Sequence, residues 1–413
     1  MPPTDGKTIE PLYPPAGDAE RAALIAWARE VPLLYGRWKH FKSLYKRAEA
    51  AGDEPELLAA LIARIDAAQP ARPATGSRSV LPPELRFVGG IVCDPARPLA
   101  LALAGSWYQA DRLQILDVSE PLRPVPLGSA RLDDPRSVCF CGSLACVLSG
   151  GSGRGGRGGQ LRCFDLSDPA RPRQTGALDV GALEGEEGFV AAFPSGRHVA
   201  AIVKNSLLVV DISEPSQPRQ AGSIGIAGAR AVAVTDRFAF VTMGGSGFRW
   251  SGLPRAGGLQ IVDVSDPAHP RALGSTDVGN PRGVAVAGRY AYVTTERGTR
   301  APVGLHVLDV SEPARPHKIG HVAGPDGGTL VLHENHALVS GGYNGLFVVD
   351  VADPIHPRFV TRLSVGGEVM GVARTGDYAL LAAGWGGLEV VDVSDPDRPV
   401  RAGEGQARKR SAT

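Results

Sequence analysis

A single phrase recurs along this chain, and it is clearest at Leu259–Pro270, where the sequence reads LQIVDVSDPAHP. Apolar residues alternate up to an aspartate, and the chain then turns through Ser-Asp-Pro and reaches a second proline. Alternation with a period of two is typical of β-strands, and Ser, Asp and Pro in succession are typical of turns. The phrase occurs seven times, with its first aspartate at Asp117, Asp165, Asp211, Asp263, Asp309, Asp350 and Asp392.

The spacing of these aspartates predicts the architecture. Strand-rich repeats of about 40–50 residues are the signature of propeller blades. Helical repeats do not fit, because the apolar period is two and Pro and Gly recur inside every unit. In the unit around Asp309 we expect four antiparallel strands, at 283–286, 290–293, 305–310 and 316–321. The sequence therefore predicts a mainly β fold, a seven-bladed β-propeller of four-stranded antiparallel blades.

The first part of the chain has a different pattern. Apolar residues recur there at helical spacing, and a stretch rich in Pro, Ala and Ser follows. One of the expected helices carries a basic face at Arg37–Arg47, but no base-reading or stacking module accompanies it, so we do not expect nucleic acid binding. We expect an N-terminal α-helical module plus linker at 1–80, the propeller at 81–405, and a flexible basic tail at 406–413.

Composition excludes several other classes of protein. The formal net charge is +1, from 44 basic and 43 acidic residues, which gives no general attraction to nucleic acid or anionic membrane. No apolar run is long enough to predict a membrane span. The chain starts without the basic segment and apolar run of a secretory signal, which predicts a cytoplasmic location. Five cysteines in 413 residues do not suggest a disulfide framework.

Four of the phrases, LQIVDVSDPAHP, LLVVDISEPSQP, LHVLDVSEPARP and LEVVDVSDPDRP, resemble the LVIVD repeat family. The resemblance extends over residues 81–405, and residues 1–80 show none. It implies a β-propeller of a bacterial or archaeal family in which many members lie at the cell surface, whereas the start of this chain predicts the cytoplasm. It implies no catalytic residues.

Several residues invite a chemical role. The seven aspartates are expected to accept backbone hydrogen bonds within the Ser-Asp-Pro turn, because a role present in every blade cannot be a single active site. A Gly142-Ser143 turn would place Cys139 opposite Cys146, as a redox pair or as apolar packing. The histidines at His333 and His336 are expected to pack within blades, and we predict no metal, cofactor or catalytic residue.

One end of the propeller is expected to carry its function. The inserted segments, at Gly150–Gly159, Gly181–Gly188, Gly244–Gly258 and Glu296–Gly304, all fall on connections that share one end of an up-and-down blade. Aromatic residues and an arginine in these connections would either contact a protein partner or pack on their own blades. These residues are Trp107, Tyr108, Phe248, Arg249, Trp250, Tyr343 and Trp385.

The mouth of the central channel offers a second candidate. The residues expected there are Arg136, Glu187, Arg230 and Arg282, with Glu368 nearby. Three arginines at one level suggest an anion site, unless the two glutamates neutralise them. We therefore predict a non-catalytic binding or scaffold protein that presents one elaborated face to a protein partner. The alternative is a propeller enzyme or a small-anion-binding protein that uses the arginines.

Overall fold

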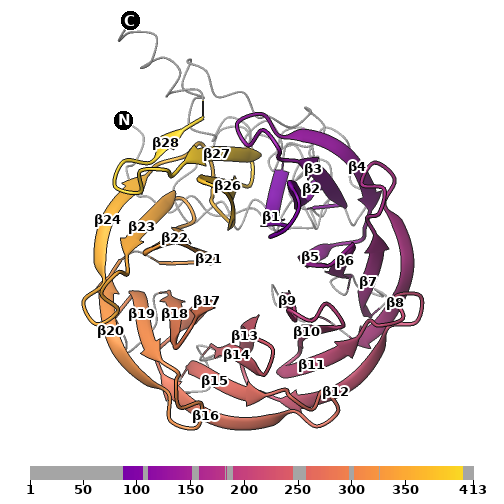
Figure 1. Cartoon of the computed structure of the whole chain (residues 1–413), viewed down its shortest axis with the longest axis horizontal. Helices are drawn as coiled ribbons and strands as arrows, with labels where there is room; N and C mark the ends of the chain where they lie inside the picture. The colour runs from indigo at the N-terminus through magenta and orange to yellow at the C-terminus, as the bar shows by residue number, and fades with distance from the viewer. Residues whose placement is uncertain are drawn as a thin grey trace, which may run out of the picture. The chain divides into compact units, whose positions relative to one another are not determined.

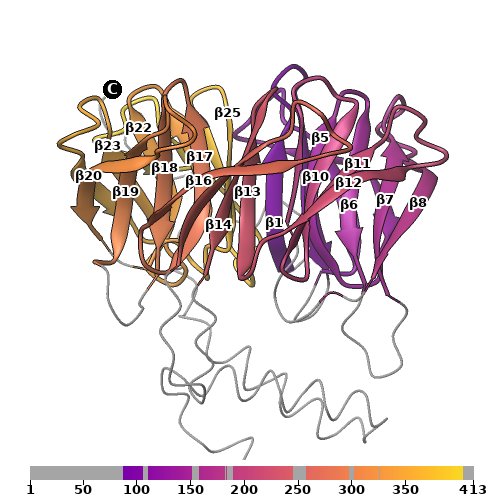
Figure 2. The same cartoon turned by 90° about the horizontal axis from the view of Figure 1, so that it is seen from below.

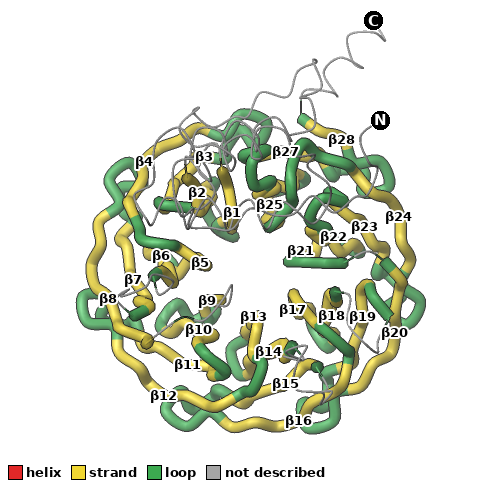
Figure 3. Tube along the Cα trace, turned by 180° about the vertical axis from the view of Figure 1, so that it is seen from behind, coloured by secondary structure: helices red, strands yellow, loops and turns green. Residues whose placement is uncertain are grey.

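The computed structural model describes residues 87–105, 110–150, 158–181, 183, 189–244, 257–296, 302–324 and 326–402. Every regular element in these residues is a strand (Figure 3). The predicted helical module at 1–80 and the tail at 406–413 lie outside them. The described part of the chain contains no helix that could cross a membrane.

The strands form seven sheets arranged as blades around a common central axis (Figure 1). Each sheet contains four strands that are consecutive in the chain and pair antiparallel. Blade 1 contains β1 (Phe87–Cys93), β2 (Leu99–Gly105), β3 (Arg112–Asp117) and β4 (Val125–Arg131), and blade 2 contains β5 (Pro135–Cys141), β6 (Leu144–Ser149), β7 (Gly159–Asp165) and β8 (Arg173–Gly181). Blade 3 contains β9 (Phe189–Ala192), β10 (His198–Val203), β11 (Ser206–Asp211) and β12 (Arg219–Gly225). Blade 4 contains β13 (Ala229–Val234), β14 (Phe238–Met243), β15 (Gly258–Asp263) and β16 (Arg271–Asp277). Blade 5 contains β17 (Pro281–Ala287), β18 (Tyr290–Thr295), β19 (Gly304–Asp309) and β20 (His317–Ala323). Blade 6 contains β21 (Leu330–His333), β22 (His336–Ser340), β23 (Leu346–Asp350) and β24 (Arg358–Leu363). Blade 7 contains β25 (Gly371–Thr375), β26 (Tyr378–Ala382), β27 (Leu388–Asp392) and β28 (Val400–Arg401). The sequence prediction of a seven-bladed propeller is therefore confirmed.

Packing between blades explains the apolar pattern of the strands. The second strand of blade 1, β2, is buried at every residue, whereas its outermost strand, β4, alternates between exposed and half-buried residues. Inner strands have a neighbouring blade on each face, so both of their faces are apolar. The buried clusters join adjacent blades; for example, Cys163 of blade 2 packs with Val199 and Val210 of blade 3. The hydrophobic core is therefore distributed around the ring.

Blade 7 closes the ring directly against blade 1. All four described strands of its sheet come from the C-terminal part of the chain. The backbones of Val88 and Gly384 exchange two hydrogen bonds of 3.0 Å across the junction. Apolar residues of the two blades, among them Val88 and Leu380, form one buried cluster there. Blades 7 and 1 are therefore in direct contact through both backbone and apolar side chains.

The recurring aspartates all make the same contact. Each accepts a hydrogen bond from the backbone N–H two residues later, at 2.8–3.0 Å, in all seven blades. In blade 4, Asp263 also accepts from the hydroxyl of Ser265 at 2.6 Å. These bonds from the Ser265 hydroxyl and amide hold the pKa of Asp263 below its usual range. The structural interpretation of the aspartates is therefore confirmed.

On the outermost strands of blades 1 to 5, a glycine then lets the turn of the next blade dock closely. A Cβ on Gly222 of β12 would lie 2.4 Å from the carbonyl oxygen of Pro267, in the turn of blade 4. Real Cβ atoms do not approach so closely, so only glycine fits. The other glycines in this contact are Gly128, Gly176, Gly274 and Gly320.

The two ends of the propeller differ in their connections (Figure 2). Links between blades and connections from second to third strands share one end, which we call the loop end. The recurring aspartate turns share the other end, which we call the turn end, with the first-to-second turns. All the long connections, such as those from Met243 to Gly258 and from Thr295 to Gly304, are at the loop end, as predicted.

Candidate functional site

Backbone bulges place three arginines at the loop end of the channel. The register between first and second strands shifts across Pro135/Ser137, Ala229/Val232 and Pro281/Gly283. These shifts contain Arg136, Arg230 and Arg282. A bulge re-aims a side chain and is common beside functional sites. The structure therefore places these residues at equivalent points of blades 2, 4 and 5.

Threonines on the second strands fix two of these bulges. The amide of Ala231, next to Arg230, donates to Thr242 Oγ1 at 3.0 Å. The amide of Gly283, next to Arg282, donates to Thr294 Oγ1 at the same distance. Both threonines are almost fully buried. The two arginines therefore extend from rigid backbone, as a preorganised site requires.

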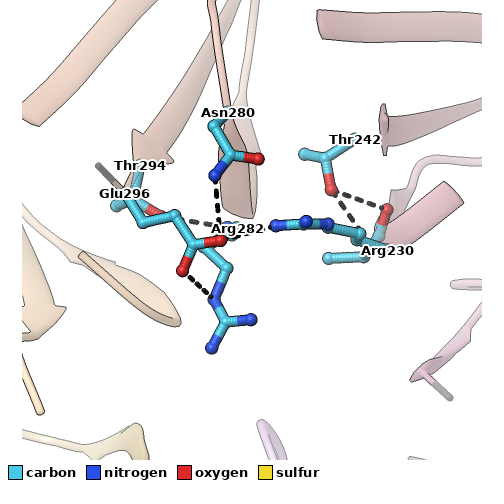
Figure 4. Close-up of polar contacts among 8 residues, drawn as sticks. Arg230, Thr242, Asn280, Arg282, Thr294 and Glu296 are labelled. Carbon is cyan, nitrogen blue, oxygen red and sulfur yellow. Dashed lines mark hydrogen bonds and ion pairs between the residues drawn. The ribbon is translucent and has the colours of Figure 1, made fainter. Parts of the chain in front are cut away.

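Glu296 joins the arginines of blades 4 and 5 (Figure 4). Its Oε1 lies 2.7 Å from Arg230 Nη1 and accepts a 3.0 Å hydrogen bond from Asn280 Nδ2. Its Oε2 lies 3.2 Å from Arg282 Nε. The side chains of Arg230 and Glu296 are 22% and 29% exposed, and that of Arg282 is 44% exposed. This cluster therefore contains two guanidinium groups and one carboxylate in contact with solvent.

The cluster leaves hydrogen-bond donors unused. Within the described residues, Arg282 contacts Glu296 through Nε, and no hydrogen bond engages its two terminal nitrogens. These nitrogens point away from Glu296 in Figure 4. Arg230 uses Nη1 alone in this contact. A guanidinium group presents five N–H donors in a planar fork that matches carboxylate and phosphate oxygens.

The remaining charged residues predicted for the mouth do not join this cluster. Arg136 forms its own ion pair with Asp134, at 2.7 Å. Glu187 lies outside the described residues. Glu368 is half-buried and forms no ion pair in the part of the chain that the structure describes. Thus the observed counter-ions of the arginines are Asp134 and Glu296, neither of which was predicted.

The predicted aromatic contacts divide into three groups. Trp385 packs edge-on against Phe87 of blade 1, with 5.8 Å between ring centroids, so it contributes to ring closure. Tyr343 is 51% exposed. The others lie outside the described residues; they are Trp107, Tyr108, Phe248, Arg249 and Trp250.

The cysteines of blade 2 form a buried row. Cys139 pairs opposite Cys146 in the register, as predicted, but both are free thiols. The shortest sulfur contacts are instead Cys139–Cys141, at 3.9 Å, and Cys146–Cys163, at 3.7 Å. Hydrogen bonding to Cys141 and Cys163, followed by burial, raises the pKa of Cys146. The hydrogen bonds with Cys139 and Cys146 lower the pKa of Cys141. All four thiols belong to the buried core cluster of blades 2 and 3, so they contribute to its apolar packing.

The histidines of blade 6 lie opposite each other across the β21–β22 hairpin. His333 pairs with His336 in the register, and its Nε2 is 4.0 Å from Asp377. Among the described residues, no three His, Cys, Asp or Glu side chains are arranged to hold a metal ion. We therefore assign these histidines no ligand.

Comparison with known proteins supports the repeat and the fold. Solved structures with similar folds include a Bacteroides uniformis protein proposed to be a 6-phosphogluconolactonase, with a TM-score of 0.55 and 14% identity over 70% of this chain and 88% of that one. Another is a protein of unknown function from Desulfotomaculum acetoxidans, with a TM-score of 0.54 and 12% identity over 75% of this chain and 92% of that one. These likenesses show the fold alone. No curated protein matches the chain in sequence.

The LVIVD repeat family matches five stretches of the sequence. They are residues 199–225, 255–278, 278–323, 326–365 and 366–404. The match begins in blade 3, so it is shorter than the resemblance over 81–405 that the turns suggest. This β-propeller therefore contains LVIVD repeats within residues 199–404.

Proposed function

We propose that this protein is a non-catalytic binding protein whose ligand carries a carboxylate or phosphate group, held by Arg230 and Arg282 at the loop end of the channel. The observation that carries the proposal is the orientation of Arg282. Glu296 fixes this side chain through Nε, and the two terminal nitrogens stay available to a ligand (Figure 4). Charge-assisted hydrogen bonds from such a fork are strong and directional.

The same contacts favour binding over catalysis. A general base must reach a proton on its substrate. Both oxygens of Glu296, the carboxylate of this cluster, already contact donors on Arg230, Arg282 and Asn280. Glu296 thus acts as a positioning residue for the arginines. A protein partner that contacts the aromatic residues around Trp250 remains a separate prediction, because those residues lie outside the described part of the chain.

Titration with acetate and inorganic phosphate tests the proposal. Ligand-observed NMR should detect binding of at least one of them to the full chain, at low ionic strength. Arg282→Gln should weaken it at least ten-fold, since hydrogen bonds to charged groups contribute about 1.5–3 kcal/mol. Arg219→Gln is the matched control, because Arg219 is a 78% exposed arginine of the outermost strand β12. Equal losses in the two variants, or no binding at all, would refute the proposal.

A further inference from the structure

The loop end of the channel has a different chemistry on blade 7. Arg282 stands one residue before the paired residues Gly283 and Thr294. Met370 stands at the same point of blade 7, one residue before the pair Gly371–Ala382. Met370 is 38% exposed. Blade 7 therefore presents a thioether where blade 5 presents a guanidinium group.

Blade 6, which lies between them, has no side chain at this point. The equivalent residue is Gly328, whose amide donates to Ser340 O at 2.7 Å. A Cβ there would lie 2.6 Å from Ser340 Oγ, so the position requires glycine or a shift of the serine. No side chain of this position therefore separates Arg282 from Met370 around the ring.

A tyrosine extends the apolar side. The backbones of Gly342 and Val369 bridge blades 6 and 7 through hydrogen bonds of 3.2 and 2.9 Å. Tyr343 and Met370 are the residues that follow this bridged pair, and Tyr343 is 51% exposed. Methionine and tyrosine both offer adaptable apolar surface to a ligand.

An acidic residue on this side limits the charge of the ligand. A Cβ placed on Gly384 would lie 3.7 Å from Met370 Sδ and 3.9 Å from Glu368 Cβ, so both residues pack beside this glycine. A second negative charge on a ligand would approach Glu368 and be repelled. The apolar side therefore suits an uncharged body.

We infer that the ligand is an amphiphilic carboxylate: a small molecule with a single carboxylate group and an apolar body. This inference rests on the proposed function, because the carboxylate of the ligand binds to Arg230 and Arg282. The apolar body then extends past Gly328 to Met370 and Tyr343. The charge of the cluster selects the head group, and the blade 6–7 side selects the body.

A series of straight-chain carboxylates tests this inference on the full-length protein. From acetate through butanoate and hexanoate to octanoate, affinity should rise roughly two-fold per added methylene, about half the gain for complete burial. Met370→Ser should flatten this rise. Arg282→Gln should weaken every member of the series. Octylammonium, the control of opposite charge, should bind at least ten-fold more weakly than octanoate.

The outcomes separate the inference from the proposed function. If Arg282-dependent acetate binding is found and chain length has no effect, the inference is wrong and the proposed function stands. If phosphate alone binds, the inference is also wrong. If neither phosphate nor any member of the series binds, both fail. If octylammonium binds as tightly as octanoate, the inference is wrong. A chain-length effect that Met370→Ser leaves intact would likewise overturn the assignment of the apolar side.

Discussion

The turn end and the loop end of this propeller are built from the same repeat, yet the blades agree at one end and differ at the other. At the turn end, each blade has an aspartate that accepts the same backbone hydrogen bond. At the loop end, the innermost strands of blades 2, 4 and 5 carry arginine at a point where blades 6 and 7 carry Gly328 and Met370. The difference separates residues that every blade needs from residues that one site needs.

A recurring residue performs a task that each blade must perform for itself. The aspartate turns the chain in every blade, and in blades 1 to 5 a glycine on the outermost strand contacts the turn of the next blade. A position that varies has no such task, so it can carry ligand contacts at little cost in stability. Changes at recurring residues should therefore affect stability, whereas changes at the mouth should affect binding.

The largest effect is expected at the glycine contact between blades. Gly222→Ala would drive a Cβ against the carbonyl oxygen of Pro267, and overpacking of this kind costs about 1–3 kcal/mol. We expect a loss near the upper end, because the obstacle is backbone. Gly225→Ala on the same strand is the matched control, since nothing lies within 4 Å of its added Cβ. Urea unfolding measures both; equal midpoints would show that the turn does not need this contact.

The contrast between recurring and variable residues has an exception wherever a variable residue strongly affects stability. His306 of blade 5 is such a residue. It is fully buried, and its ring lies 4.5 Å from that of its cross-strand partner His321. Burial, the charge on His321 and the nearby Lys318 lower the pKa of His306 to about 4. The hydrogen bond between its ring and the carbonyl of Pro302 acts in the opposite direction and raises this pKa, but by less. Burial and Lys318 also lower the pKa of His321.

The sign of the resulting pH dependence follows from these shifts. The unfolded chain takes up protons below about pH 6.5, whereas the folded chain resists them. Stability from these neutral imidazoles is therefore complete above pH 6.5 and is lost as pH falls toward 4. From pH 7.5 to 5 we expect a loss of about 2 kcal/mol from His306. His306→Gln should flatten this pH profile, because it removes the titrating ring. The blades accommodate glutamine at this position, since Gln114 and Gln260 occupy it in blades 1 and 4. Unchanged pH dependence in this variant would refute the assignment.

The fold was predictable because turn chemistry recurs. The strands expected at 283–286 and 290–293 are observed as Pro281–Ala287 and Tyr290–Thr295. Each boundary moved by a few residues at most, since the glycine turn between these strands and the aspartate turn that follows fix the register. Repeat alignment also placed Arg230 and Arg282 at one level.

The partner of those arginines was not predictable from the same pattern. Glu296 is 66 residues from Arg230 and belongs to the next blade. Their contact depends on the ring bringing blades 4 and 5 together and on bulges that shift the register. Periodicity reports which face of a strand a residue occupies, whereas a bulge changes that face locally. Glu296 was visible only as the first residue of an inserted segment.

Removal of a turn carboxylate should lower stability less than Gly222→Ala does. Asp263→Ala deletes the acceptor of the Ser265 amide and hydroxyl, at 2.9 and 2.6 Å. We expect a loss of about 1 kcal/mol, because water can reach the exposed partners. Asp263→Asn keeps one acceptor oxygen and should lose less than half as much. Thermal unfolding of both variants at pH 7 checks this, and a larger loss for asparagine than for alanine would contradict the turn interpretation.

Glu296→Gln should have the smallest effect on stability and the opposite effect on binding. Partly exposed ion pairs contribute about 0.2–1 kcal/mol, and glutamine keeps an oxygen that Arg230 and Asn280 can contact. The variant removes the carboxylate that contacts both Arg230 and Arg282, so acetate affinity should rise several-fold at low salt. The rise should shrink as salt screens the site. A loss of stability as large as that of Asp263→Ala, or a fall in acetate affinity, would mean that the mouth is part of the framework, and the contrast between the two ends would then fail.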